Sequence, residues 1–213
     1  MDTLAAIVAR RSVKHYDPEA VMPDADLRVL LEHLALTPSS FNMQNWHFVV
    51  ARDAEVKGAL KAAAWNQAQV SDCCTTFVLC GDLKGHEKTD RYLRPAPENV
   101  QEMMKGFITQ IYGDNDALLR DEACRSIGLA GQTLMLAAKA LGYDSCPMIG
   151  FDPGKVAEAL ALPDHVLPLL MITVGKAASP ARPRMGILDL DELVSVDRYG
   201  NHAITGPVGI AAE

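Results

Sequence analysis

The sequence lacks the features that mark several common classes of protein. No apolar run reaches the roughly 18 residues that a membrane-spanning helix needs, so no membrane partner is expected. The N-terminus, MDTLAAIVARRSVKHYD, carries its cations after its apolar run, whereas a secretory signal carries them before it. We therefore expect a cytoplasmic protein.

Cysteine is sparse and follows no metal-binding or disulfide pattern. The 5 cysteines are an odd number and form no C-x-x-C pair. The 6 histidines are scattered without ligand spacing, so no metal site is expected. Reduced thiols in a cytosolic protein are the simplest interpretation, with Cys80 as a small core residue.

Positive charge is also in short supply. The chain has 20 Lys+Arg against 27 Asp+Glu, a formal net charge of -7. Proteins that coat nucleic acids are usually basic, so no nucleic-acid partner is expected. An anionic ligand would have to be held by a local basic cluster.

The 213 residues, 49% of them hydrophobic, suit a single domain over 1–213. Apolar runs predict strands at His47–Ala51, Thr75–Gly81 and Val166–Gly175, with a short extended piece at Ser145–Gly150. Helical spacing predicts helices over 3–10, from Pro23-Asp24 to before Pro38, over 53–72 in two pieces, and over 100–112, 116–141 and 152–162. The helix over 116–141 is apolar on most faces, which indicates a central, buried position. This mixture favours an α+β fold.

The last 38 residues, from Lys176 on, contain little that could fold alone. A tail of this kind often lies across another surface, so residues 176–213 indicate an oligomer.

The standard catalytic signatures are missing, among them G-x-G-x-x-G, G-x-x-x-x-G-K-[ST], H-E-x-x-H and G-x-S-x-G. The first positive signal is Arg10-Arg11-Ser12-Val13-Lys14, with three cations and a hydroxyl in five residues. Two guanidiniums and an ammonium can neutralise a phosphate dianion, although a solvated basic turn is the alternative.

Carboxamides gather in two places. The loop from Pro38 to Trp46 places hydroxyls and amides between an apolar helix and a buried strand, where they suit the edge of a heterocycle or form a self-satisfied turn. Asn66 and Gln69, at i and i+3, are predicted to share one helix face that meets the same heterocycle or faces solvent.

Two later segments complete the set. Pro147-Met148-Ile149-Gly150 is a flat apolar run ending in glycine, which lets a ring lie against backbone, unless it is an ordinary strand end. Arg182-Pro183-Arg184 is a second small basic site.

Taken in order, "RRSVKHYDP", "TPSSFNMQNWHFVVA", "WNQAQVSDC", "GYDSCPMIGFDPGKV" and "ITVGKAASPARPRM" resemble the FMN-dependent nitroreductase family. The resemblance runs from about residue 3 to about residue 194. It implies an α+β fold with a central mixed sheet flanked by helices. It also implies a homodimer with FMN at the interface and a domain-swapped C-terminal arm.

The resemblance also assigns cofactor-binding residues. For the FMN phosphate and part of the ring edge it implies Arg10, Arg11, Ser12, Lys14, Arg182 and Arg184. For the pyrimidine edge it implies Asn66 and Gln69, and for one ring face Pro147, Met148, Ile149 and Gly150. From the other subunit it implies Pro38, Ser39, Ser40, Asn42 and Gln44.

The activity implied is reduction of nitroaromatics, quinones or similar electron-poor molecules by NAD(P)H, with ping-pong kinetics. The chemistry belongs to FMN, so no catalytic side chain is named. The segment 82–116 is expected to be a variable helical excursion over the active site, where Tyr92, Phe107 and Tyr112 either cover the pocket or pack as core.

Other functions stay open at this point. A non-enzymatic flavin carrier or sensor would need the same residues. Enone reduction, dehalogenation or flavin fragmentation would keep the enzyme class, and a generic phosphate-ligand protein would need only the basic clusters.

Overall fold

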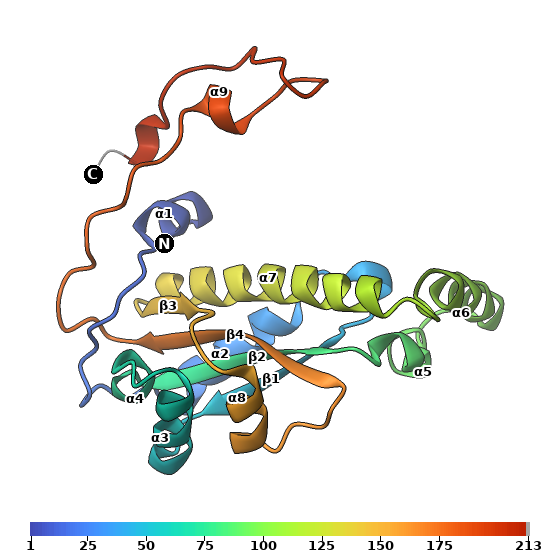
Figure 1. Cartoon of the computed structure of the whole chain (residues 1–213), viewed down its shortest axis with the longest axis horizontal. Coiled ribbons are helices and arrows are strands. Elements are labelled where there is room, and N and C mark those ends of the chain that lie inside the picture. Colours follow the sequence, from blue (N-terminus) through green and yellow to red (C-terminus); the bar gives the residue numbers. More distant parts are fainter. Residues whose placement is uncertain (212–213) are drawn as a thin grey trace.

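The computed structural model describes residues 1–211, and its centre is a four-stranded sheet with helices on both faces (Figure 1). The strand order is β1-β2-β4-β3, and every neighbouring pair is antiparallel. The strands are β1 (Trp46–Ala51), β2 (Thr75–Asp82), β3 (Asp144–Met148) and β4 (Val166–Gly175). The α+β fold predicted from the sequence is confirmed. The sheet was expected to be mixed, but its four strands pair only antiparallel. The parallel pairing in the structure is an isolated bridge between Ser12 and Ser145.

The two central strands carry the core. All eight residues of β2 are buried, as expected for a strand with neighbours on both edges and helices on both faces. Side chains alternate: Phe77 and Leu79 join one hydrophobic cluster, while Val78 and Cys80 join the cluster on the other face. The apolar runs that predict β2 and β4 therefore locate them to within one residue.

Helices α2 (Asp24–Ala35) and α7 (Asp116–Ala140) cover the first face. Leu30 and Leu34 of α2 pack against Leu134 of α7, all three without solvent exposure. Gly142 follows α7 with a φ of 78°, the left-handed conformation that ends a helix. Only the sheet side of α7 matches the predicted burial, because Leu129 on its other side is 49% exposed.

Helices α3 (Ala54–Ala63), α4 (Gln69–Asp72) and α8 (Pro153–Ala159) lie on the opposite side (Figure 1). The prediction that Asn66 shares a helix face with Gln69 is wrong. Trp65 and Asn66 have φ values of 53° and 59°, so a left-handed turn separates α3 from α4. Helix α8 ends before the predicted residue 162, since Ala161 is also left-handed.

The excursion predicted over 82–116 contains α5 (Thr89–Tyr92) and α6 (Glu98–Tyr112), which project from one end of the body (Figure 1). Tyr92 and Tyr112 pack with Met43 in a small separate core. Phe107 is instead 48% exposed.

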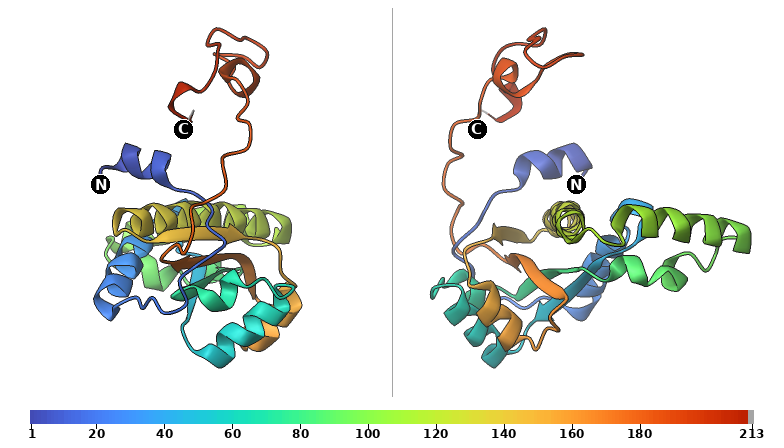
Figure 2. Two further views of the ribbon diagram at one scale, coloured as in Figure 1. Left: turned by 90° about the vertical axis from the view of Figure 1, so that its left-hand side faces the viewer. Right: turned by 45° about the vertical axis from the view of Figure 1, so that its right-hand side comes forward.

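Both ends of the chain leave the body on the side of α7 (Figure 2). Helix α1 (Thr3–Ala9), capped by the Asp2 carboxylate, stands beside the segment that leads to α9 (Leu190–Leu193). Within the described residues, the hydrogen bonds of 186–211 stay inside that segment. The predicted arm spans 176–213, and its last two residues lie outside the described part.

None of the helices described between residues 1 and 211 has the length and apolar character needed to cross a membrane.

Replacing Leu134 by alanine tests the packing of α7 on the sheet. We expect Leu134→Ala to lower the free energy of unfolding by about 2–5 kcal/mol, because it leaves a cavity in a fully buried core. Urea titration followed by circular dichroism measures the loss. The exposed Met103 of α6 provides the control, since Met103→Ala should stay within about 0.5 kcal/mol of wild type. Equal effects of the two substitutions would contradict this account of the core.

Candidate functional site

Four arginines from the two ends of the chain meet around one cavity. The cavity is about 340 Å³ and is lined by Arg10, Arg11, Ser12, Arg182, Pro183, Arg184, Met185 and Ile187. We call Arg10, Arg11, Arg182 and Arg184 the arginine cradle. The structure thus brings together two basic motifs that lie more than 170 residues apart in the sequence.

Backbone pairing holds the cradle in place. Residues 12–17 run beside β3 and the end of β4: Val13 N–H donates to Ser145 O (3.1 Å), and Asp17 N–H donates to Lys176 O (2.9 Å). Arg184 Nη2 then donates to Val8 O (2.6 Å) and Arg10 O (3.0 Å), while Arg11 Nη2 donates to Arg182 O. Each end of the chain therefore positions the guanidiniums of the other.

The cradle carries uncompensated positive charge. None of its four guanidiniums pairs with a carboxylate anywhere in residues 1–211. Burial lowers the pKa of Arg10 below its usual value, and the nearby Arg184 and Arg11 cations lower it further. Arginine stays charged despite such a shift, so an anion is the natural occupant.

Lys14 lies outside the cradle, along the edge of β3. The bridge between Ser12 and Ser145 is parallel, so Lys14 lies level with Pro147. The buried Cys146 between these positions has a raised pKa, because burial outweighs the opposing effect of the Lys14 and Arg10 cations. Its thiol therefore stays protonated.

A chain of amides borders the end of β3. Gln69 Nε2 donates to Gln67 Oε1 (2.9 Å), and Gln67 Nε2 donates to Gly150 O (2.9 Å). Gln69 Nε2 also lies 3.6 Å from Met148 Sδ. The structure thus joins the predicted Gln69 to the predicted segment Pro147–Gly150, through a Gln67 that sequence reasoning missed. Three carboxamides within four residues, Asn66-Gln67-x-Gln69, could have pointed to Gln67.

The backbone N–H groups of Ile149 and Gly150 are free to bind a ligand. Ile149 is 81% exposed, and neither its N–H nor that of Gly150 donates a hydrogen bond to residues 1–211. A Cβ at Gly150 would lie 3.1 Å from Trp65 Cζ3 and 3.3 Å from Gln67 Nε2, so glycine lets these two side chains pack closely against the backbone here. Asn66, exposed on the adjacent left-handed turn, lies in the same neighbourhood.

The second amide-rich segment, Pro38–Gln44, is a strained loop built around a 3-10 turn. Phe41, Asn42 and Gln44 have φ values of 52°, 55° and 49°. Ser39 Oγ accepts from Gln44 N–H (2.9 Å), and Tyr112 of α6 donates to Ser40 Oγ (2.9 Å). These bonds fix the loop while leaving the Asn42 side chain exposed.

The strained loop lies far from the cradle within one chain. It leads into β1, one edge of the sheet, at the end where Asn45 O accepts from Asp82 N–H. The cradle borders β3, the other edge, at the end where Asp144 pairs with Gly175. The six residues of β1 alone amount to about 20 Å. One chain therefore does not bring the two halves of the predicted site together.

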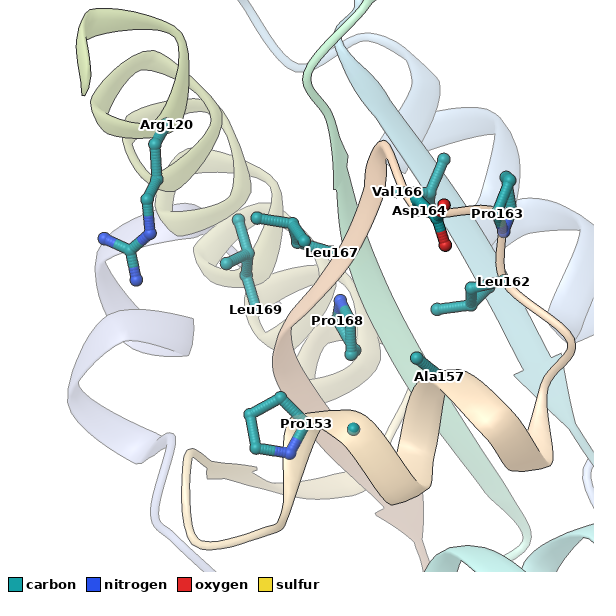
Figure 3. Close-up of a pocket in the computed structure, with 11 residues that line it drawn as sticks. Arg120, Pro153, Ala157, Leu162, Pro163, Asp164, Val166, Leu167, Pro168 and Leu169 are labelled. Atoms are coloured by element: carbon teal, nitrogen blue, oxygen red, sulfur yellow. The ribbon is translucent and has the colours of Figure 1, made fainter. Parts of the chain in front are cut away.

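Another groove, of about 360 Å³, lies between α7, α8 and the start of β4 (Figure 3). Its walls are mostly proline and leucine, with Arg120 and Asp164 as the charged residues. No predicted site residue lines it. Within residues 1–211, no group of three or more His, Cys, Asp or Glu side chains could hold a metal ion.

Comparison with known proteins gives one consistent result. The model of the nitroreductase family matches residues 7–176. The protein DrgA of Synechocystis sp. is 44% identical over 182 residues, which cover 85% of this chain and 87% of DrgA. YodC of Bacillus subtilis, named as an NAD(P)H nitroreductase, is 34% identical over 185 residues, 84% of this chain and 92% of YodC.

A solved structure agrees. A protein from Exiguobacterium sibiricum, described as a nitroreductase and solved in complex with FMN, superposes with a TM-score of 0.83 at 28% identity. The superposition covers 92% of this chain and 97% of that one.

Proposed function

The chain belongs to the nitroreductase family and is an oxidoreductase, and we propose that it uses FMN and NAD(P)H to reduce nitroaromatics, quinones or similar electron-poor small molecules. The observation that carries the proposal is the arginine cradle, four guanidiniums without a carboxylate partner in residues 1–211, on the same edge strand as the amide-bordered backbone at Ile149 and Gly150.

The residues present fit FMN. Its phosphate dianion matches a cavity whose arginines have no carboxylate partner within residues 1–211. Its flat ring, with a rim of alternating donors and acceptors, matches the surface at Ile149 and Gly150 beside Gln67 and Gln69. A Cβ at Gly150 would crowd this surface.

Each group of residues has a separate task. The cradle and Ser12 hold the phosphate, Lys14 lies along the strand that joins the cradle to the ring surface, and the amide chain orients the ring rim. When bound, FMN supplies the redox chemistry between nicotinamide and acceptor, which no side chain of the protein can carry. We infer that the electron donor and the electron acceptor bind at the same place in turn. The redox chemistry belongs to FMN, so the protein itself needs no nucleophile or general base.

A second copy of the chain completes the site in this proposal. The loop residues Pro38, Ser39, Ser40, Asn42 and Gln44 lie at the far edge of the sheet from the cradle, and a partner's loop can reach what the chain's own loop cannot. An interface on the side of α7 is supported by exposed apolar side chains of α1, α7 and the arm, which are Leu4, Ile7, Val8, Leu129, Met185, Leu188 and Leu193. We propose that the outer part of the arm, residues 186–211, whose hydrogen bonds stay within that segment, lies across the partner.

The absorbance spectrum of the FMN-loaded protein tests the activity. Anaerobic NADH or NADPH should bleach the flavin band at about 450 nm, and a nitroaromatic or quinone should restore it. Initial rates should then give parallel double-reciprocal lines, the pattern of ping-pong kinetics. Loaded protein that never bleaches would refute the proposal. Bleaching without turnover would favour a carrier or sensor, and product analysis would separate enone reduction, dehalogenation and flavin fragmentation.

Removing one cradle arginine should weaken FMN binding. We expect Arg10→Ala and Arg184→Ala each to cost about 2–5 kcal/mol of affinity, because each leaves phosphate charge without a partner. Fluorescence titration of the apoprotein with FMN measures the change. Arg28→Ala is the control, since Arg28 pairs with Glu32 on the exposed side of α2 and should leave the affinity unaltered. Unchanged affinity in both cradle variants would show that the phosphate lies elsewhere.

The proposed dimer predicts a mass of twice 23.0 kDa in sedimentation equilibrium. Placing charge on the arm with Leu188→Asp and Leu193→Asp should produce monomers, because a carboxylate would then be buried in the interface. It should also weaken FMN binding, since the partner's loop is lost. Met103→Asp on the exposed face of α6 should leave the dimer intact. A wild-type monomer with full FMN affinity would contradict the two-chain site.

A further inference from the structure

The excursion forms a second polar cavity beside the strained loop. This cavity is about 250 Å³ and is lined by Met43, Gln44, Arg91, Tyr92 and Arg94. It lies at the end of the body from which α5 and α6 project, away from the chain's own cradle (Figure 1). Gln44 belongs both to this cavity and to the loop proposed to reach the partner's cofactor.

Two arginines near α5 have no carboxylate partner among the described residues. Lys88 pairs with Asp82, and Asp90 pairs with Lys105 at 2.6 Å. Arg91 and Arg94 pair with no carboxylate in the part of the chain that the structure describes. Two guanidiniums thus share a small cavity in a protein whose net charge is -7. An anion in this cavity would receive charge-assisted hydrogen bonds from these guanidiniums.

Tyr92 also lines the cavity, but its hydroxyl is buried behind the wall. Tyr92 is 9% exposed, and its buried hydroxyl has no partner within residues 1–211. Burial raises the pKa of Tyr92 to about 12, so the hydroxyl keeps its proton at neutral pH. A buried hydroxyl without a partner is costly. Because this hydroxyl is closed to solvent, the anion contacts are assigned to Arg91 and Arg94 alone.

We propose that Arg91 and Arg94 bind the anionic group of a substrate, a carboxylate or a phosphate, and so direct the enzyme toward negatively charged substrates. The inference rests on the proposed function, because Gln44 links this cavity to the cofactor. A volume of about 250 Å³ holds one anionic group with part of a ring and not a whole dinucleotide. The group comes either from the electron acceptor or from the pyridine nucleotide.

A pair of matched acceptors separates charge from shape. 4-Nitrobenzoate and 4-nitrobenzamide have nearly the same size, and only the first is charged. Calorimetric titration of the oxidised, FMN-loaded protein should show at least about tenfold tighter binding of the benzoate. The double variant Arg91→Gln, Arg94→Gln should remove that preference while leaving benzamide binding unchanged. In turnover, KM for the benzoate should rise with little change in kcat.

The two sources of the anion give different results. If the acceptor supplies it, the double variant loses the benzoate preference and keeps the wild-type ratio of KM values for NADPH and NADH. If the nucleotide's phosphate supplies it, the variant changes that ratio, or raises both KM values, and the two nitro compounds bind alike throughout. Arg28→Gln is the control and should change none of these quantities.

Equal binding of the two acceptors together with unchanged nucleotide KM values in the double variant would overturn the inference. That outcome would leave the proposed function intact, because the variant would still load FMN and turn over. A wild-type protein that takes up no FMN would refute the proposed function itself.

Discussion

The gathering of four guanidiniums around one cavity is the constraint on which the rest of the structure depends. Like charges at close range repel, and burial of Arg10 adds a desolvation cost. The fold offsets part of this cost by tying Arg11 and Arg184 to backbone carbonyls from the opposite end of the chain. In the proposed function, the phosphate dianion of FMN would offset more of this cost and so stabilise the pairing of residues 8–17 with 176–184.

This coupling explains why the ends of the chain are built as they are. Little of the sequence from 176 on could form a core, and the first seventeen residues contain one short helix. These segments are held to the body by edge bridges such as Tyr16–Ala177 and by the arginine–carbonyl bonds. In the proposed assembly, the cofactor and a second chain would stabilise them further. Leu188 and Leu193 of the arm are 54% and 55% exposed in the single chain, and the proposed partner would bury them.

Strands β2 and β4 could be predicted from the sequence because continuous apolar runs bounded by polar residues have one simple structural solution. The basic motifs at Arg10 and Arg184 could be recognised too, although their meeting depends on long-range bridges that no local pattern encodes. Gln67 was missed because its role follows from the turn at Trp65 and Asn66. A left-handed turn that begins at a tryptophan leaves only a weak signal in the sequence, since Asn66 alone is of a type that favours this conformation. Arg91 and Arg94 were missed for a related reason, since their lack of carboxylate partners appears only after α5 and α6 are placed.

Backbone strain is concentrated in two segments that the proposed function uses. Within residues 1–211, seven non-glycine residues have positive φ. Five of them lie in the strained loop or in the turn before Gln67: Phe41, Asn42, Gln44, Trp65 and Asn66. Each costs of order 1–3 kcal/mol, which a loop free to relax would not retain. In the proposed assembly, the first group would aim the carboxamides of the partner's loop. The turn at Trp65 and Asn66 leads directly to Gln67, which donates to Gly150 O. The two strained turns lie at different edges of one sheet, so in the proposed assembly each acts with the cradle of a different chain.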